Sequence, residues 1–533
     1  MIKRILVGLG AAALVLALAW PALPQQASQP SPSSSDQKTL NLSIEDCILK
    51  ALKYNLKLQV QVLNPEQSDL AITLAEEQFI PSLSFGYTKR NTAAASYSFL
   101  DSGGTTTQAQ ASYSAQVNEN LPTGGVILAS LTSYSLDSNA SFQTINPRYG
   151  STLTLNFTQP LLKNFGFDIA RQGIIIARNN RDISDLQFKK FLEDKIYEVE
   201  QDYWNLVYAI ENLKVLQQSV ELAKELLEKN QRSVEIGTMA PIEVLSAQAE
   251  VAAREADILG GVAQVKVSED ILRTVMNLEA EIPGAEKIRL IPSSVPTSEP
   301  KDVSFENSFQ AALDNRPDLA ATRVNIKNSE FNLTIAKNQL LPDLSLNAQY
   351  WSPGVSGTQL IYLNNNPLTG VIIGTIPGGA ASSFTDAFNF KYKNWSVGLT
   401  LNVPLSSVFS RAAQAEARVS LDQALLNLKD QQQQLFLDLS NATLAVQTNY
   451  KSVQAYRVAR ELAQKKVEAE EERLRVGLST NYLVLQYQRD LATQQGLELK
   501  AIIAYNLSLA NLETVEGLSL KNKRIEISDW LKR

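Results

Sequence analysis

The longest pattern in the chain is an apolar residue at every seventh position from Leu206 onward. A heptad spacing of this kind is typical of a helix that packs along a partner helix. The pattern breaks at Gly237 and Pro241, which are expected to end one helix and begin the next. The stretch therefore predicts a helical hairpin. Its seam positions are Leu206, Leu213, Val220, Leu227 and Val234 before the turn, and Leu245, Ala252 and Leu259 after it.

The chain repeats this hairpin 240 residues later, in the same register. The second turn runs from Val476 to Thr480, and Arg460 is the one polar residue of the second seam. An offset that holds over so many positions indicates a duplicated unit rather than two unrelated coiled coils. The second seam consists of Val446, Val453, Arg460, Val467 and Leu474, followed by Leu485, Ala492 and Leu499.

Ahead of each long helix the apolar period changes from that of a helix to that of a strand, at Pro81 and again at Pro342. Large apolar side chains then alternate with small or polar ones, which predicts strands with one apolar and one polar face. Each unit returns on another alternating strand, at residues 151–160 and 395–404. Further alternation at residues 112–121 and 126–136 fits either a hairpin of the same sheet or a loop. Before Pro81, Asn64-Pro65 is expected to separate two short helices.

These patterns divide the 533 residues into two copies of one unit. Its long helices, about 170–236 and 411–476, would each stretch roughly 100 Å at 1.5 Å per residue, which no compact domain does. The predicted segments are a signal peptide (1–24), a flexible leader (25–41), a first repeat (42–280, strands about 81–160, helical hairpin about 170–278), a linker around the outside (281–303), a second repeat (304–518, strands about 342–404, hairpin about 411–516) and a short basic tail (519–533), expected to be mobile.

The N-terminal residues indicate export. Lys3 and Arg4 precede an apolar run from Ile5 to Trp20, as in a secretory signal peptide, with an uncleaved anchor as the alternative. After Trp20 the sequence holds no further run of about 18 apolar residues. A membrane-crossing mature chain would therefore use strands, and four clear strands cannot close a barrel with a lumen. Several copies would then share one barrel, and their long helices would form a second cylinder.

Composition argues against most other functions. The net charge of −6 offers no basic surface for nucleic acid. The chain has no histidine and one cysteine, so the commonest general base and metal ligand is absent and Cys47 has no disulfide partner. Cys47 falls on a short amphipathic helix and is expected to be a buried apolar residue. The sequence suggests no enzyme, no cofactor and no metal site.

These features in this order resemble the TolC family of outer-membrane efflux proteins. The resemblance covers about residues 42–518 and rests on the duplicated helix–strand–strand–long-helix–hairpin unit, the strand entries at 80–84 and 341–345, and the Val476–Thr480 turn followed by Leu485. It implies a mainly α fold with membrane β: a homotrimer with one outer-membrane β-barrel, continued by a long α-helical barrel in the periplasm. It also implies outer membrane lipid around the barrel, and a periplasmic adaptor protein and an inner-membrane pump as partners. The implied function is the passive exit duct of a tripartite efflux or type I secretion system.

The same resemblance implies sites at the hairpin turns. The residues that would dock the adaptor are Gly237, Thr238, Gly477, Leu478 and Ser479. Without the resemblance they are ordinary helix-ending turns. The family also narrows its periplasmic entrance with acidic side chains, which Glu243 matches, whereas the second unit has Leu483 and Gln486 there. Glu250 and Asp490, related by the 240-residue offset, would form an acidic ring that concentrates cations, or would lie on a solvated face.

One alternative function stays open at this point: a structural or adaptor coiled coil that spans the periplasm without a pore. It would account for the helical hairpins but not for the paired two-faced strands. The cargo is not indicated by the sequence, although the absence of histidine and the scarcity of methionine argue against a dedicated metal path.

Overall fold

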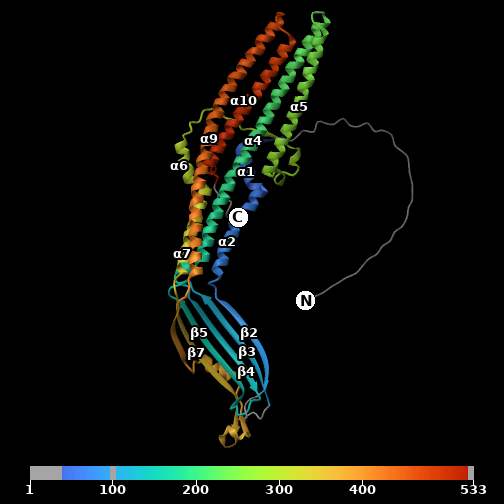
Figure 1. The fold of residues 1–533 in the computed structure, drawn as a ribbon. Helices are drawn as coiled ribbons and strands as arrows, with labels where there is room; N and C mark the ends of the chain where they lie inside the picture. The colour runs from blue at the N-terminus through green and yellow to red at the C-terminus, as the bar shows by residue number, and fades with distance from the viewer. Residues whose placement is uncertain (1–38, 96–103, 526–533) are drawn as a thin grey trace, which may run out of the picture.

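The computed structural model describes residues 39–95 and 104–525. The predicted signal peptide, most of the predicted leader and the last eight residues of the tail lie outside these ranges. The described chain is long and narrow, with helices at one end and a sheet at the other (Figure 1). Among the described helices, none combines the length and the apolar character needed to cross a membrane.

Both repeats follow the predicted order of short helices, strands and a long helical hairpin. The two longest helices, α4 and α9, have 64 and 68 residues and lie side by side with their hairpin partners (Figure 1). The helices are α1 (Ile44–Tyr54), α2 (Leu56–Glu77), α3 (Phe167–Ala170), α4 (Gln172–Glu235), α5 (Pro241–Met276), α6 (Phe305–Asn315), α7 (Pro317–Asn338), α8 (Ala380–Phe388), α9 (Val408–Arg475), α10 (Asn481–Val515) and α11 (Ser519–Asn522).

The first two helices do not break where the sequence suggested. The prediction of a break at Asn64-Pro65 is wrong, because α2 continues through Pro65. The break lies at Asn55, whose side chain accepts a hydrogen bond from the Leu58 amide (3.1 Å) and so caps α2. The first helix starts at a capping box in which Ser43 and Asp46 bond each other's backbone amides, both at 3.1 Å.

A seven-stranded antiparallel sheet holds strands from both repeats, in the order β2-β3-β4-β5-β7-β8, with β9 also on β7. The alternating segments at 112–136 are β3 and β4, which lie inside this sheet and not in a loop. A separate parallel pair joins β1 to β6. The strands are β1 (Thr39–Leu42), β2 (Ser82–Ala95), β3 (Thr105–Asn120), β4 (Val126–Ser138), β5 (Ile145–Pro160), β6 (Arg289–Pro292), β7 (Asp343–Tyr362), β8 (Ile372–Ile376) and β9 (Asn394–Asn402).

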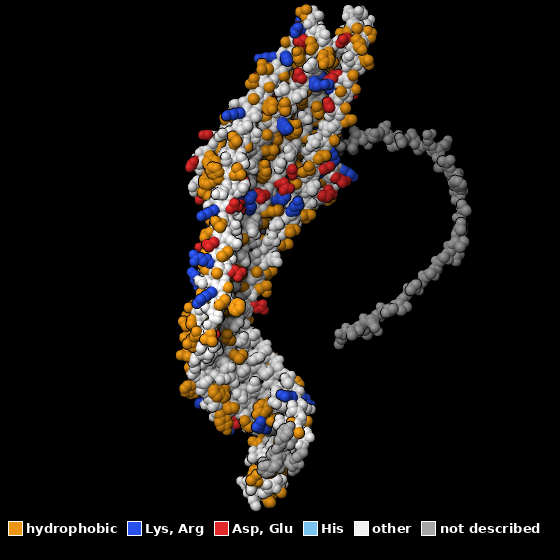
Figure 2. Space-filling model, in the orientation of Figure 1, with side chains coloured by type: hydrophobic (Ala, Val, Ile, Leu, Met, Phe, Trp, Pro, Cys, Tyr) orange, Lys and Arg blue, Asp and Glu red, His pale blue; other side chains and the backbone are white. Residues whose placement is uncertain are grey.

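The sheet has one apolar and one polar face, as the alternation predicted. The strand register places apolar residues opposite apolar ones and polar residues opposite polar ones. Phe157 pairs with Ala348, for example, and Thr158 pairs with Asn347. The apolar face includes Phe85, Tyr113, Leu131, Leu155, Leu399 and Trp395, and the polar face includes Ser84, Gln116, Thr132, Asn156, Gln349 and Thr400. Helix α8 lies on the apolar face, where Ser383 bonds the Ser151 hydroxyl (2.9 Å). Charged side chains gather over the helices and are few on the visible side of the sheet (Figure 2).

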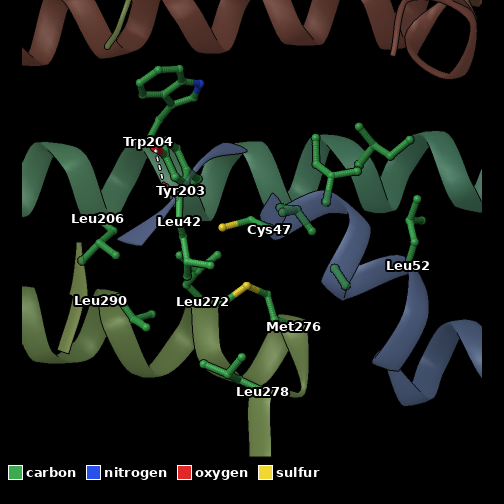
Figure 3. Packing of buried hydrophobic residues seen from close by; sticks show 14 of the residues in the cluster. Leu42, Cys47, Leu52, Tyr203, Trp204, Leu206, Leu272, Met276, Leu278 and Leu290 are labelled. Atoms are coloured by element: carbon green, nitrogen blue, oxygen red, sulfur yellow. Dashed lines mark hydrogen bonds between the residues drawn. The ribbon is translucent and has the colours of Figure 1, made fainter. Parts of the chain in front are cut away.

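The largest core lies where α1, α4, α5 and the linker meet (Figure 3). Cys47 is completely buried there, as expected, and burial raises the pKa of its thiol to about 12. The hydroxyl of Tyr203 accepts a hydrogen bond from the Ser294 amide (2.8 Å) and donates one to the Leu42 carbonyl (3.3 Å). Asn506 on α10 in turn bonds both backbone groups of Thr297. The linker therefore runs as an ordered belt across both repeats.

The predicted seam is correct on α4, α9 and α10 but wrong on α5 within one copy. Leu245 and Leu259 are 59% and 72% exposed. Helix α5 instead buries Ala247 and Val251 against α4 and α10. Because α5 is apolar on two faces, the heptad alone did not show which face its own chain covers.

The predicted mobile tail is wrong for residues 519–525. Leu520 is buried in the main core, and Lys523 pairs with Glu200 of α4. The polypeptide after α10 is therefore fastened to the first repeat by a buried leucine and a largely buried ion pair.

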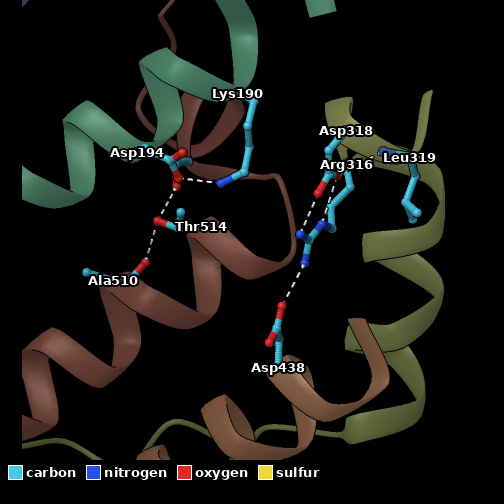
Figure 4. Close-up of polar contacts among 9 residues, drawn as sticks. Lys190, Asp194, Arg316, Asp318, Leu319, Asp438, Ala510 and Thr514 are labelled. Carbon is cyan, nitrogen blue, oxygen red and sulfur yellow. Dashed lines mark hydrogen bonds and ion pairs between the residues drawn. The ribbon is translucent and has the colours of Figure 1, made fainter. Parts of the chain in front are cut away.

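The junction between the repeats contains a buried acid on α4. Figure 4 shows the polar contacts nearby, where Arg316 pairs with Asp318 (2.6 Å) and reaches Asp438 of α9 (3.7 Å). On α4, Glu193 is completely buried, and neither of its carboxylate oxygens has a hydrogen-bond partner among the described residues. Burial raises the pKa of Glu193 to about 7; Lys189 and Lys190 oppose the rise, and Asp194 and Asp318 add to it.

Glu193→Gln is expected to stabilise the fold at pH 8 and to change little at pH 5. A raised carboxyl pKa stabilises the fold below the ordinary value near 4.5, and this contribution is lost as the pH rises through about 7. The shift corresponds to a gain on the order of 3 kcal/mol at pH 8. Thermal unfolding at both pH values measures it, with Glu225→Gln, an exposed change on the same helix, as the control. An equal gain at both pH values would contradict a buried ionised carboxylate.

Candidate functional site: the paired helical tips

Each long hairpin turns on a glycine in the left-handed conformation, with φ +74° at Gly237 and +79° at Gly477. The amides of Thr238 and Leu478 bond carbonyls five residues back, at 2.9 and 2.8 Å, and the glycine amides bond carbonyls three residues back. This pair of bonds is a Schellman motif, which caps the last turn of a helix. Pro241 then begins α5. Both turns lie at the end of the molecule farthest from the sheet (Figure 1).

Four of the five turn residues are exposed and available to a partner: Gly237, Thr238, Gly477 and Leu478. The fifth, Ser479, is partly buried and donates its hydroxyl to Glu470. Glu470 is itself buried and also pairs with Arg473 (3.3 Å). Ser479 therefore holds the second turn in place, while the other four form the tip surface.

The two hairpins are joined just below their tips by Asn481, the first residue of α10. Its side-chain amide donates to the Glu243 carboxylate and to the Met239 sulfur, both at 3.2 Å. Asn481 is buried, and its side-chain oxygen Oδ1 has no hydrogen-bond partner in the described part of the chain. Glu243, the candidate entrance acid of the first repeat, is thus half-buried and tied to the second repeat.

Seven residues after Glu243 on α5, Glu250 links the two hairpins through two arginines. Arg489 of α10 donates to both carboxylate oxygens of Glu250, at 2.5 and 3.2 Å, and Arg254 donates to one of them at 2.8 Å. Arg254 is only 4% exposed and also donates to the carbonyls of Ser219 (2.8 Å) and Leu485 (2.9 Å). A single guanidinium thereby connects α4, α5 and α10.

These arginines decide the charge of Glu250. Desolvation acts to raise its pKa, but hydrogen bonds and charge from Arg254 and Arg489 outweigh it, and the net pKa is lowered. Glu250 is therefore ionised and compensated, which leaves it little free negative charge for an acidic ring within one copy.

The other two predicted entrance residues lie on the exposed side of α10. Gln486 and Asp490 are both exposed, and Asp490 forms no ion pair within residues 39–95 and 104–525. The structure brings Glu243 and Glu250 into contact with α10, but through Asn481 and Arg489, and not through Gln486 or Asp490. In the described ranges no cluster of His, Cys, Asp or Glu is arranged to hold a metal ion.

Sequence reasoning missed Arg254, Arg489 and Asn481. Near the tips, Arg254 is the one charged side chain on the buried stripe of α5, beside Ala247 and Val251. A charged residue on an otherwise apolar stripe was the feature of the sequence that could have indicated a buried polar contact. Its partners on α10 lie more than 200 residues away in the chain, so no local pattern pointed to the pairing.

The fold and site together define a class: a duplicated protein with a membrane-type two-faced sheet and long helical hairpins that end in paired tips. A family model of the outer membrane efflux protein matches residues 126–278 and 309–518. This chain belongs to the outer membrane efflux protein family. No curated protein sequence matches the chain.

Solved structures share the fold at low sequence identity. Crystal structures of CusC, described with its transmembrane channel formation, match with a TM-score of 0.63 at 14% identity over 93% of this chain and 96% of that one. The CmeC outer membrane channel of Campylobacter jejuni matches at 0.60 and 15% identity over 96% and 98%. The outer membrane protein VceC of Vibrio cholerae matches at 0.60 and 14% over 89% and 96%. At these identities the likeness shows the fold alone.

Glu250→Gln is expected to loosen the contact between the two tips. The change leaves the buried Arg254 without its carboxylate and weakens the bond to Arg489, at a local cost of about 1–3 kcal/mol. Amide hydrogen exchange should rise at residues 241–254 and 481–489. Asp490→Asn, a neutralisation one residue from Arg489, is the matched control and should leave exchange unchanged. Equal exchange in both variants would contradict the role given to Glu250.

Proposed function

We propose that this protein is the passive exit duct of an efflux or secretion assembly in the outer membrane. Three copies share one barrel and one helical tunnel, as the family resemblance implies. An inner-membrane pump supplies the energy, and a periplasmic adaptor joins the pump to the tips. Membership of an outer membrane efflux family, which is not an enzyme family, supports this proposal.

The open sheet is the observation that carries the proposal. Strand β2 has 14 residues and β9 has nine, and in the described chain each has a partner on one side only. Their apolar faces are bare, with Phe85 76% and Trp395 72% exposed. In lipid an unpaired edge costs several kcal/mol for each backbone group, so the sheet must close on neighbouring copies.

The helical part has open edges that fit the same assembly. Helix α2 carries an exposed apolar stripe at heptad spacing, and α5 and α9 carry others. The exposed residues are Leu56, Val60, Leu63, Leu70 and Leu74 on α2, Ile242, Leu245 and Leu259 on α5, and Leu437, Leu444, Val458 and Leu462 on α9. Stripes on both sides of one copy would pack against its neighbours and leave no apolar helix face in water.

The tips form the periplasmic end in this proposal. Gly237, Thr238, Gly477 and Leu478 dock the adaptor because they are exposed, and Ser479 keeps its turn in shape. Glu243 and Asp490, repeated around the threefold axis, make the acidic entrance, whereas the charge of Glu250 is taken up by Arg254 and Arg489. A coiled coil without a pore would not need the two-faced sheet, which is why the duct is preferred.

Planar-bilayer conductance of the detergent-solubilised oligomer tests the duct and its entrance. We expect a small conductance that prefers cations, because carboxylates concentrate cations at a narrow mouth. Replacing Glu243 with Gln and Asp490 with Asn should reduce that preference, while Asp302→Asn in the outer linker should not. No conductance would contradict the duct, and unchanged selectivity in the double variant would contradict only the acidic entrance.

A further inference from the structure

Two strands of the sheet have no helix attached. Strand β2 follows α2, β5 leads into α3 and α4, β7 follows α7, and β9 leads into α9. In the described residues β3 and β4 are flanked along the chain only by strands, and they pair with β2, with each other and with β5 over most of their length. The β3–β4 hairpin therefore widens the sheet without adding a helix below it.

The number of helices that reach the sheet determines the circumference of the helical ring above it. In each copy α2 packs on α4, α4 on α7, and α7 on α9, so four helices stand in a row above the strands. Three copies place twelve helices in a ring, and at 8–10 Å between axes the ring measures about 100–120 Å. This estimate rests on the trimer proposed above.

The hairpin decides how many strands the three copies bring to the barrel. Across one copy the sheet has six strand positions, because β8 and β9 continue each other on the same side of β7. Three copies give about eighteen strands, which at about 4.8 Å spacing and about 40° tilt span roughly 110 Å. Without β3 and β4, twelve strands would span only roughly 75 Å.

We propose that the β3–β4 hairpin gives the trimer an eighteen-stranded barrel with a wide lumen lined by uncharged polar side chains. The hairpin presents uncharged polar side chains to the lumen, among them Ser112, Ser114, Gln116, Asn118, Ser130 and Thr132. Such hydroxyl and amide groups keep water in the lumen and bind no single charge type.

The ladder allows a clean excision of the hairpin. Leu83, Val117, Ala129 and Leu155 lie in one row across four strands and on one face. Strand β2 is antiparallel to β5, and removing two strands leaves the alternation of faces intact. Deleting residues 104–139 would join the segment after β2 to the segment before β5.

The test is polymer exclusion on full-length and excised channels, with poly(ethylene glycol) of graded size added on the outer side. Allowing about 5 Å for inward side chains, the lumen radius is about 12 Å with eighteen strands and about 7 Å with twelve. We expect the largest polymer that lowers the conductance to fall in radius by about a third or more on excision. An unchanged cut-off, or a full-length cut-off near 7 Å, would overturn the wide barrel while leaving the duct intact.

A second measurement applies if the excised chain does not assemble. Electron cryomicroscopy of the full-length oligomer should show eighteen strands and a barrel as wide as the helical part. Twelve strands, with residues 105–138 outside the barrel wall, would overturn the inference. An oligomer with no barrel and no conductance would instead count against the proposed function.

Discussion

The backbone hydrogen bonds at the two edges of the sheet constrain everything else in this structure. Strand β2 and strand β9 each present a row of amides and carbonyls that no other described strand of the same copy pairs with. An apolar outer face such as that of Phe85 and Trp395 belongs in lipid, where water cannot satisfy those groups. In the part that the structure describes, one copy therefore leaves the backbone groups of its two edge strands unpaired. The helices at its edges likewise leave their apolar heptad stripes uncovered.

The two repeats are held to each other by polar contacts at well-separated levels. Near the sheet end, the side chain of Asn328 on α7 bonds those of Asn179 (2.6 Å) and Asn180 (3.2 Å) on α4. At the middle, the linker belt is bonded by Tyr203 from the first repeat and by Asn506 from the second. At the tips, Arg254 and Arg489 meet on Glu250.

The sequence predicted the repeating elements well because they depend on local periodicity. The heptads of α4 and α9, the switch to strands at Pro81 and Pro342, and the glycine turns at Gly237 and Gly477 all correspond to observed elements. It could not show which of two apolar faces α5 would bury, since that depends on a partner helix far away in the chain. For the same reason the hydrogen bond from Arg254 to the Leu485 carbonyl and the burial of Leu520 were not predicted. The position of β3 and β4 in the sheet also remained undecided.

Disulfide trapping between copies tests the central claim, that the sheet closes on its neighbours, most directly. In a Cys47→Ala background, a cysteine at Ser84 of β2 would be combined in turn with one at Ser396, Thr400 or Asn402 of β9, all on the polar face. Oxidation in outer-membrane fractions is expected to give a covalent trimer on a denaturing gel for at least one pair. A cysteine at Asp302 in place of the β9 position is the control and should give none. If every pair remains monomeric, or if only dimers form, the shared barrel is contradicted.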